Sequence, residues 1–299
     1  MLKKKLCIGT AQFGTDYGIT NLVGRIQIEE VKEILKLMRK NDINLIDTAR
    51  SYGDSEKIIG KIIDKNDDFF KIITKISPYF TKELSNRNQF NEWTKLFEDS
   101  LARLNKNMIE GILIHSNKIN LNQRLILMDW LLELKNRGKV KKIGWSIYEE
   151  KDLESINLKN IDLVQLPFSF YDQRLMASGF LKKLYEEGIE VHARSIFLQG
   201  LILTNYSNWP KWVDSRDNEL HKVMQKNISS IGSTPIEMAI SYVKACPYVD
   251  ALVFGFTSTR ELLEIIKVFN NQSKFISTNN FCNINFSSKL LDPRLWPTN

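Results

Sequence analysis

Short apolar runs alternate with helical patterns along this chain of 299 residues, and this alternation restricts its fold more than any other feature. Between the runs, apolar residues recur every three or four positions, most clearly from Phe90 to Leu104, as they do on the buried face of a helix. Eight of the runs have the length of a buried strand and lie at residues 6–8, 45–47, 70–77, 109–115, 140–146, 163–166, 190–195 and 251–254.

Eight strand–helix units in a chain of this length predict a (β/α)8 barrel, the TIM-barrel fold. The main alternative is a doubly wound sheet, which would bind a dinucleotide through a Gly-x-Gly-x-x-Gly turn after a strand. The sequence contains neither that turn nor a P-loop motif, and no Pro/Gly/Ser-rich linker divides it. We therefore expect a single α/β domain over residues 1–299.

The composition, with 43% hydrophobic and 26% charged residues, is typical of a soluble globular protein. No run is long enough to cross a membrane, and the apolar stretch after the basic residues 3–5 is too short for a signal peptide, so we expect a cytoplasmic protein with no membrane partner. The net charge of +7 is spread along helix faces, which argues against nucleic acid as a partner. Cys7, Cys246 and Cys282 are odd in number and far apart, which favours reduced thiols.

Polar residues occur where the predicted strands end, and in a β/α barrel these ends meet at the face that carries the active site. Taken singly, each has an ordinary alternative, because a lone histidine after apolar residues or a lone tyrosine is usually a packing residue. A carboxylate at the end of a buried strand, in contrast, needs a partner. Four such residues follow one another in the second to fourth units: Asp47, Tyr52, Lys75 and His115.

These four side chains suit proton donation to a carbonyl group. The ordinary pKa of a tyrosine, about 10, is too high for an ideal acid at neutral pH. We expect the ammonium group of Lys75 to lower the pKa of Tyr52 and Asp47 to keep Lys75 charged. His115 would orient the carbonyl oxygen by a hydrogen bond. Three dispersed histidines in the whole sequence predict no metal site.

The segment after Tyr52 predicts a tight turn followed by a helix. Gly53 permits the turn, and Asp54 or Ser55 can cap the helix, with Glu56 in its first turn facing the positive end of the helix dipole. Two further glycines, Gly138 and Gly188, are expected to end helices just before a strand.

This set of residues resembles the motifs of the aldo-keto reductases. The likeness covers nearly the whole chain and is carried by Ile46-Asp47-Thr48-Ala49-x-x-Tyr52-Gly53-x-Ser55-Glu56, Thr74-Lys75 and Leu113-Ile114-His115. It implies a (β/α)8 barrel and hydride transfer between NADP(H), less often NAD(H), and a small-molecule carbonyl or alcohol. By position it implies the roles of general acid for Tyr52, pKa modulator for Lys75, partner of Lys75 for Asp47 and substrate-orienting residue for His115.

The resemblance also implies how the cofactor is bound. The nicotinamide amide would contact Ser146 and Gln165. The other implied cofactor contacts are Thr10, Asp47, Arg194, Ser195, Phe197, Gln199, Gly255, Thr257, Ser258, Arg260 and Glu264. Several of them follow the last two strands, where barrels commonly bind phosphate.

The chain departs from the family pattern at several positions. Ile147 stands where an asparagine is usual, so one contact to the amide is lost. Arg194 stands where many members stack an aromatic ring on the nicotinamide, and its guanidinium can stack but adds a charge. Arg260 is the candidate for the 2′-phosphate of NADP, and the alternative is that the protein accepts NAD. The chain also begins almost at its first strand, without the hairpin that closes the barrel floor in many members.

Two segments, residues 12–18 and 193–200, resemble a bacterial subgroup that often accompanies enzymes of surface-sugar biosynthesis. This resemblance suggests a sugar or nucleotide-sugar carbonyl as substrate. The alternatives are a cofactor-sensing barrel with little turnover and a barrel with lyase or isomerase chemistry.

Aromatic candidates for the pocket wall are Tyr17, Tyr79, Phe80, Tyr171 and Trp209.

Overall fold

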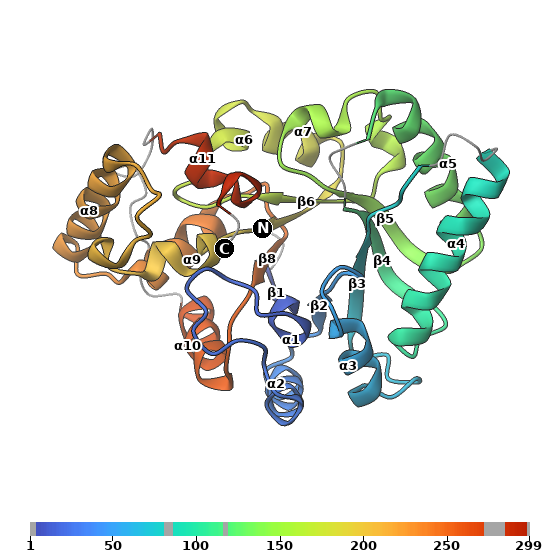
Figure 1. Cartoon of the computed structure of the whole chain (residues 1–299), viewed down its shortest axis with the longest axis horizontal. Helices are drawn as coiled ribbons and strands as arrows, with labels where there is room; N and C mark the ends of the chain where they lie inside the picture. The colour runs from blue at the N-terminus through green and yellow to red at the C-terminus, as the bar shows by residue number, and fades with distance from the viewer. Residues whose placement is uncertain (1–3, 81–85, 116–118, 272–284, 298–299) are drawn as a thin grey trace.

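The computed structural model describes residues 4–80, 86–115, 119–271 and 285–297. Its eight strands pair in parallel and in chain order, and β8 returns to pair with β1, so the sheet closes into a barrel. Figure 1 shows the helices arranged around the outside of these strands. The strands are β1 Lys5–Gly9, β2 Leu45–Asp47, β3 Lys71–Ile76, β4 Ile109–Ile114, β5 Val140–Ser146, β6 Leu163–Pro167, β7 Glu190–Arg194 and β8 Ala251–Phe254.

The predicted single-domain (β/α)8 barrel is therefore confirmed. The predicted bounds hold for β2, β5 and β8, and the other strands differ by one residue at one or both ends. The helices are α1 Ala11–Gly14, α2 Ile28–Lys40, α3 Ser55–Ile62, α4 Asn86–Arg103, α5 Leu121–Asn136, α6 Arg174–Ala177, α7 Phe180–Glu186, α8 Ser215–Ser230, α9 Pro235–Ala245, α10 Thr259–Asn270 and α11 Ser288–Leu291, with the 3₁₀ turns η1 Glu150–Leu153, η2 Leu158–Asn160, η3 Leu198–Leu203, η4 Tyr206–Asn208 and η6 Pro293–Leu295.

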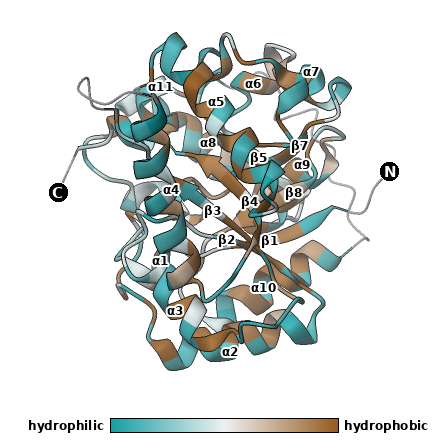
Figure 2. Cartoon of the chain, turned by 90° about the vertical axis from the view of Figure 1, so that its right-hand side faces the viewer, coloured by the Kyte–Doolittle hydropathy of each residue, from teal (hydrophilic) through white to brown (hydrophobic). Residues whose placement is uncertain are grey.

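Two hydrophobic layers hold the barrel together. One fills its interior and consists of Cys7, Leu45, Ile73, Leu113, Leu163, Ala251 and Val253. The other, larger layer lies between strands and helices and includes Trp93 and Phe97, two members of the predicted stripe on α4. Figure 2 shows the largely hydrophobic strands enclosed by helices that are hydrophilic on their outer side. No helix of the described residues is both long and apolar enough to cross a membrane.

The cysteines and glycines of the described residues behave as expected. Cys7 and Cys246 are free and buried, and burial raises the pKa of the Cys7 thiol well above its ordinary value. Cys282 lies outside the described residues. Gly138 and Gly188 follow α5 and α7 with φ angles of 67° and 74°, a backbone conformation that favours glycine.

The start of α3 differs from the expectation. Gly53 makes the turn, with a φ angle of 55°, but no side chain caps the helix at its N-cap residue, Asp54. The hydroxyl of Ser55 instead donates to the backbone oxygen of Thr10 at 3.0 Å. Glu56 lies in the first turn, as predicted, but is buried and accepts a hydrogen bond from Thr74 Oγ1 at 2.6 Å. Both side chains point into the barrel wall, because that wall supplies the hydrogen-bond partners.

Ion pairs lie near the N-terminal ends of the strands, at the floor of the barrel. Lys142 Nζ lies 2.5 Å from Glu190 Oε2 and 3.2 Å from Glu110 Oε1. The buried ring of His192 contacts the same Glu190 through Nε2 at 2.8 Å. Burial opposes ionisation of Glu190, but His192 and Lys142 outweigh it and lower the pKa of this carboxyl well below its ordinary range. The carboxylate thus links β5 and β7 at the floor.

Candidate active site

A cavity of about 650 Å³ opens at the C-terminal ends of the barrel strands. All the predicted site residues line it except Lys75, which is buried beneath it, and Ser258. The cavity therefore gathers, from distant parts of the sequence, Thr10, Asp47, Tyr52, His115, Ser146, Gln165, Arg194, Ser195, Phe197, Gln199, Gly255, Thr257, Arg260 and Glu264.

Lys75 lies at the centre of the four predicted catalytic residues. Its ammonium group, on a side chain that is 1% exposed, donates to Asp47 Oδ2 at 2.6 Å, to the backbone oxygen of Thr48 at 3.2 Å and to the Tyr52 hydroxyl at 3.2 Å. The second oxygen of Asp47 accepts a hydrogen bond from Gln165 Nε2 at 2.8 Å. These contacts join β2, β3 and β6 in one buried network that ends at a phenol facing the cavity.

The position of Tyr52 is fixed by close backbone packing. A Cβ atom on Gly14, the last residue of α1, would lie 1.9 Å from the backbone oxygen of Tyr52 and 2.4 Å from the backbone nitrogen of Ser55. A Cβ atom on Gly53 would in turn lie 2.3 Å from the backbone oxygen of Gly14. The two glycines allow α1 and the turn before α3 to touch, and this contact holds the phenol beside Lys75.

The pKa of Tyr52 corrects one expectation. Burial, the largest effect, raises the pKa of Tyr52 above its ordinary value, and Lys75 acts in the opposite direction without outweighing burial. Burial alone would lower the pKa of Lys75, but the charge of Asp47 and the neighbouring Tyr52 more than offset it, so this pKa is raised. Lys75 thus stays charged, as predicted, and limits the rise in the Tyr52 pKa rather than bringing it below 10.

His115 is held as a neutral imidazole. Burial, followed by the charges of Lys75 and Arg194, lowers its pKa from 6.5 to about 3. Its Nδ1 lies 3.4 Å from the hydroxyl of Ser51, and its ring meets that of Tyr52 edge-on, with the centroids 6.2 Å apart. At neutral pH the ring can therefore give a hydrogen bond to an oxygen atom but not a positive charge.

Two buried polar atoms of the cavity have no hydrogen-bond partner among the described residues. They are Ser146 Oγ and Gln165 Oε1, and their side chains are 7% and 0% exposed. Buried polar atoms are normally paired, so this pair suits a ligand that carries both a donor and an acceptor. A carboxamide such as that of nicotinamide has both, and these residues fit the cofactor implied by the sequence.

The segment after β7 has an unusual backbone. Ser195, Leu198 and Gln199 all have positive φ angles, between 47° and 59°, which cost energy in residues other than glycine. Gln199 ties this segment to the loop after α1, because its side chain accepts from the backbone nitrogen of Ile19 at 3.1 Å and its backbone oxygen accepts from Thr20 Oγ1 at 2.9 Å. The two loops thus form one wall of the cavity.

Ser258 is the one expected cofactor contact that lies away from the cavity lining. Its hydroxyl accepts from the backbone nitrogen of Glu261 at 3.3 Å and caps α10. Gly255 does line the cavity, where a Cβ atom would lie 2.9 Å from Gln12 Nε2. The side chain of Arg260 is exposed at the start of α10.

Of the aromatic candidates for the pocket wall, Tyr17 alone lines the cavity. The half-buried Phe80 packs edge-on against Trp93, and the buried rings of Tyr171 and Trp209 pack against His221. Tyr148, which the sequence reasoning missed, lines the cavity two residues after Ser146. Its position just beyond the end of β5 could have identified it as a cavity residue.

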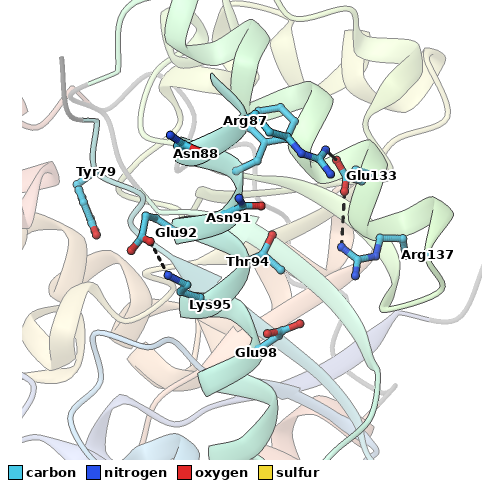
Figure 3. Close-up of a pocket in the computed structure, with 11 residues that line it drawn as sticks. Tyr79, Arg87, Asn88, Asn91, Glu92, Thr94, Lys95, Glu98, Glu133 and Arg137 are labelled. Atoms are coloured by element: carbon cyan, nitrogen blue, oxygen red, sulfur yellow. Dashed lines mark hydrogen bonds and ion pairs between the residues drawn. The ribbon is translucent and has the colours of Figure 1, made fainter. Parts of the chain in front are cut away.

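Tyr79 belongs to a second hollow, a groove of about 810 Å³ on the outer side of α4 and α5. Figure 3 shows its charged side chains, among which Lys95 pairs with Glu92 at 2.7 Å and Arg137 with Glu133 at 3.5 Å. Each is an ordinary ion pair between surface side chains three or four residues apart in the sequence. None of the four predicted catalytic residues reaches this groove, so the barrel mouth is the candidate active site.

The comparisons with known proteins agree with this geometry. A model of the aldo/keto reductase family matches residues 5–278. An uncharacterised oxidoreductase of Schizosaccharomyces pombe is 27% identical over 208 residues, which cover 68% of each chain.

Two solved structures share the fold. An aldo-keto reductase from Bacillus halodurans, in its holo form, has a TM-score of 0.71 at 17% identity, with 89% of this chain and 87% of that chain covered. An aldo/keto reductase from Klebsiella pneumoniae, solved with NADP and acetate, has a TM-score of 0.66 at 15% identity, with 97% and 93% covered. The family match over nearly the whole chain shows that the protein belongs to the aldo/keto reductases, a family of NAD(P)-dependent oxidoreductases.

Proposed function

We propose that this protein reduces the carbonyl group of a small molecule with NADP(H), with Tyr52 as the general acid. The contact of Lys75 with both Asp47 and Tyr52 carries this proposal, because it places a buried, fixed cation against a phenol that faces the cavity. The unpaired atoms of Ser146 and Gln165 support a bound nicotinamide.

When bound, the reduced nicotinamide supplies a hydride to the carbonyl carbon. Tyr52 gives its phenolic proton to the carbonyl oxygen, and the ammonium group of Lys75 stabilises the phenolate that remains. His115, neutral at physiological pH, donates a hydrogen bond that orients the same oxygen. Asp47 keeps Lys75 charged and in place, so each of the four residues has a distinct role.

The cofactor is proposed to be NADP(H), with Arg260 at its 2′-phosphate. Arg260 lines the cavity and forms no ion pair with any described residue, so its charge is available to a phosphate. NAD(H) is the alternative, and separate fluorescence titrations with NADPH and NADH distinguish the two. If Arg260→Gln weakens NADPH binding and leaves NADH binding unchanged, the assignment stands, and equal effects on both contradict it.

The substrate is proposed to be a sugar or a nucleotide sugar. Hydroxyl and amide side chains line the cavity beside its aromatic rings, among them Tyr17, Thr20 and Asn21. Such groups suit a polyhydroxy substrate. A screen of aldoses and nucleotide sugars for NADPH oxidation tests this class, and activity confined to apolar aldehydes would contradict it.

The variant Tyr52→Phe tests the mechanism. Because it removes the proton donor and keeps the ring, kcat should fall by about a hundred- to ten-thousand-fold, while the dissociation constant for NADPH stays near that of the wild type. The probe is the reduction of 4-formylbenzoate, followed by the loss of NADPH absorbance. Full turnover by Tyr52→Phe would overturn the role of Tyr52. Tight NADPH binding by the wild type with no turnover on any aldehyde would favour a cofactor-sensing protein instead.

A further inference from the structure

The side chain of Ser51 contacts His115 without lining the cavity itself. Ser51 precedes Tyr52 in the turn between β2 and α3, and it is exposed. Its hydroxyl oxygen lies 3.4 Å from Nδ1 of His115, and it is the one hydrogen-bond partner that the ring of His115 has in the described part of the chain. This contact connects an exposed loop residue to a ring that faces the cavity.

The backbone on both sides of Ser51 is fixed. The backbone nitrogen of Arg50 donates to the backbone oxygen of Lys75 at 3.0 Å, and that of Tyr52 donates to the backbone oxygen of Ala49 at 3.0 Å. The first of these bonds ties the turn to β3, and the second closes the turn. The hydroxyl of Ser51 is therefore held near the ring of His115, and only the rotation of its own short side chain is left free.

The backbone of His115 is fixed as well. Its nitrogen donates to the backbone oxygen of Ile76 at 2.8 Å, and its oxygen accepts from the hydroxyl of Ser77 at 2.7 Å. A neutral imidazole carries its single N–H on either Nδ1 or Nε2, and the hydrogen bond at one nitrogen sets the protonation of the other. Because the lowered pKa of His115 keeps the ring neutral, the partner of Nδ1 determines which of the two forms is present.

The two forms act differently on a carbonyl oxygen, which can only accept hydrogen bonds. With the proton on Nε2, Nδ1 accepts from the Ser51 hydroxyl and the Nε2–H group is left to donate. With the proton on Nδ1, the hydroxyl accepts instead, and the lone pair left on Nε2 repels the carbonyl oxygen. A serine hydroxyl can donate or accept, but only the first arrangement serves the reduction of a carbonyl group.

We propose that the Ser51 hydroxyl donates to Nδ1 of His115 and thereby stabilises the tautomer that carries its proton on Nε2. Ser51 is then a positioning residue, which prepares His115 to donate to the substrate and does not touch the substrate itself. The inference rests on the proposed function and adds a residue to its mechanism. One hydrogen bond between uncharged groups changes the ratio of two states by about two- to tenfold, and this is the effect expected on the tautomer ratio.

The tautomer can be measured directly, because the whole sequence contains only three histidines. Nitrogen NMR of the protein with isotope-labelled histidine separates protonated from unprotonated ring nitrogens by their chemical shifts. The variant His115→Gln lacks the signals of His115 and so assigns them. In the wild type at neutral pH, Nε2 of His115 should be protonated and Nδ1 unprotonated.

Ser51→Ala should shift the tautomer ratio of His115 towards the form protonated on Nδ1 by about two- to tenfold. Ser51→Thr keeps the hydroxyl and should retain the wild-type signals. Ser77→Ala is the matched control, because Ser77 is also exposed and bonded to His115, but through the backbone oxygen, so the tautomer should not change. A wild type protonated on Nδ1, unchanged signals in Ser51→Ala, or an equal shift in Ser77→Ala would each overturn the proposal.

Turnover gives an independent readout. In Ser51→Ala, kcat/KM for 4-formylbenzoate should fall by about two- to tenfold, while the dissociation constant for NADPH stays at the wild-type value. The fall should disappear when His115→Gln is already present, because the nitrogen that the hydroxyl contacts is then missing. If Ser51→Ala lowers kcat/KM by the same factor in both backgrounds, Ser51 acts independently of His115 and the proposal is overturned.

The NMR measurement separates this inference from the proposed function, because it needs neither cofactor nor substrate. If the wild type fails to bind NADPH but shows the Nε2–H form and its loss in Ser51→Ala, the proposed function falls and the control of the tautomer by Ser51 stands. If NADPH binds and 4-formylbenzoate is reduced, but Ser51→Ala leaves the signals of His115 unchanged, the opposite holds.

Discussion

Beneath the phenol of Tyr52, the ammonium group of Lys75 has its three N–H groups directed at three oxygen atoms. Asp47 is its one close carboxylate among the described residues. Moving two charges out of water is costly, and only their close contact and further hydrogen bonds offset that cost. Removing one partner should therefore lower the free energy of unfolding more than removing both. This asymmetry gives a test of the pair that does not depend on finding the substrate.

The variant Lys75→Met should destabilise the protein by about 3–5 kcal/mol, because it leaves the buried carboxylate of Asp47 without a counterion. The double variant Asp47→Asn with Lys75→Met should recover part of that loss, since it removes both charges. Urea unfolding of the wild type, both single variants and the double variant gives the coupling between the two sites. Simple additivity of the two single effects would show that the ion pair does not act as a unit.

The sequence predicted the identity and the contacts of these residues because Asp47 and Lys75 lie near the ends of recognisable apolar runs and Tyr52 follows the first of these runs in the family motif. It did not predict the net direction of the Tyr52 pKa. The charge of Lys75 is visible in the sequence, but the burial of the phenol is not, and burial proved the larger effect on the pKa. A motif thus predicts reliably which groups are in contact, but it does not predict how far each of them is removed from water.

At the scale of elements, the contact of α1 with the turn before α3 positions the proposed acid. Gly14→Ala would place a methyl group 1.9 Å from the backbone oxygen of Tyr52, and the turn must move to relieve that overlap. Because small displacements of a reacting group cost up to about a hundred-fold in rate, kcat should fall by about tenfold or more, measured with 4-formylbenzoate and NADPH.

Gly138→Ala is the control for this change. Gly138 has a positive φ angle of 67°, and a Cβ atom there would meet no other atom within 4 Å. The substitution should cost about 1–2 kcal/mol of stability through its backbone alone and should not change kcat. If both alanine variants lose turnover equally, general destabilisation rather than displacement of Tyr52 explains the result.

Strands were predicted well and loops were not, for a physical reason. A buried strand needs a continuous apolar run, which the sequence shows directly. The aromatic residues of loops have no such local constraint, and Tyr171, for example, packs on Phe286 with ring centroids 4.2 Å apart, more than a hundred residues along the chain. The prediction of a cap on α3 failed for the same reason, because the Ser55 hydroxyl donates its hydrogen bond to Thr10 rather than accepting one from its own helix.

At the scale of the whole molecule, His221 of α8 joins distant segments. Its Nε2 lies 2.7 Å from the backbone oxygen of Thr204, its Nδ1 contacts the Tyr171 hydroxyl, and its ring stacks on Trp209 with centroids 4.0 Å apart. Burial lowers the pKa of His221 from 6.5 to about 4. The native state therefore holds this ring neutral over a range of pH in which the unfolded chain protonates it.

The stability of the protein should fall as the pH drops from about 6.5 towards 4, because in that range the unfolded state binds one more proton at His221 than the native state. Above 6.5 the contribution is fully present. In His221→Gln the slope of the free energy of unfolding against pH should be shallower by up to about 1.4 kcal/mol per pH unit. Urea unfolding at intervals across this window measures both slopes, and identical slopes would show that His221 is not the group responsible.

The whole fold could be predicted because eight strand–helix units in one chain allow few arrangements, and the family motifs sit at the matching strand ends. The cavity could be predicted only where its lining side chains lie at or just after the ends of strands. The contact of Arg194 with Tyr148, and of Tyr148 with Arg294, joins β7, the loop after β5 and the C-terminal segment. No local pattern encodes such a three-way contact.

The pairing of β1 with β8, which sets Ile8 beside Phe254, has a consequence for how activity arises during folding. The cavity takes residues from Gly9 to Ile265, so it does not exist until the last strand has closed on the first. Contacts between residues so far apart along the chain form slowly. We therefore expect no activity from a chain that still lacks β8, and we expect the return of turnover after denaturation to report the closure of the barrel.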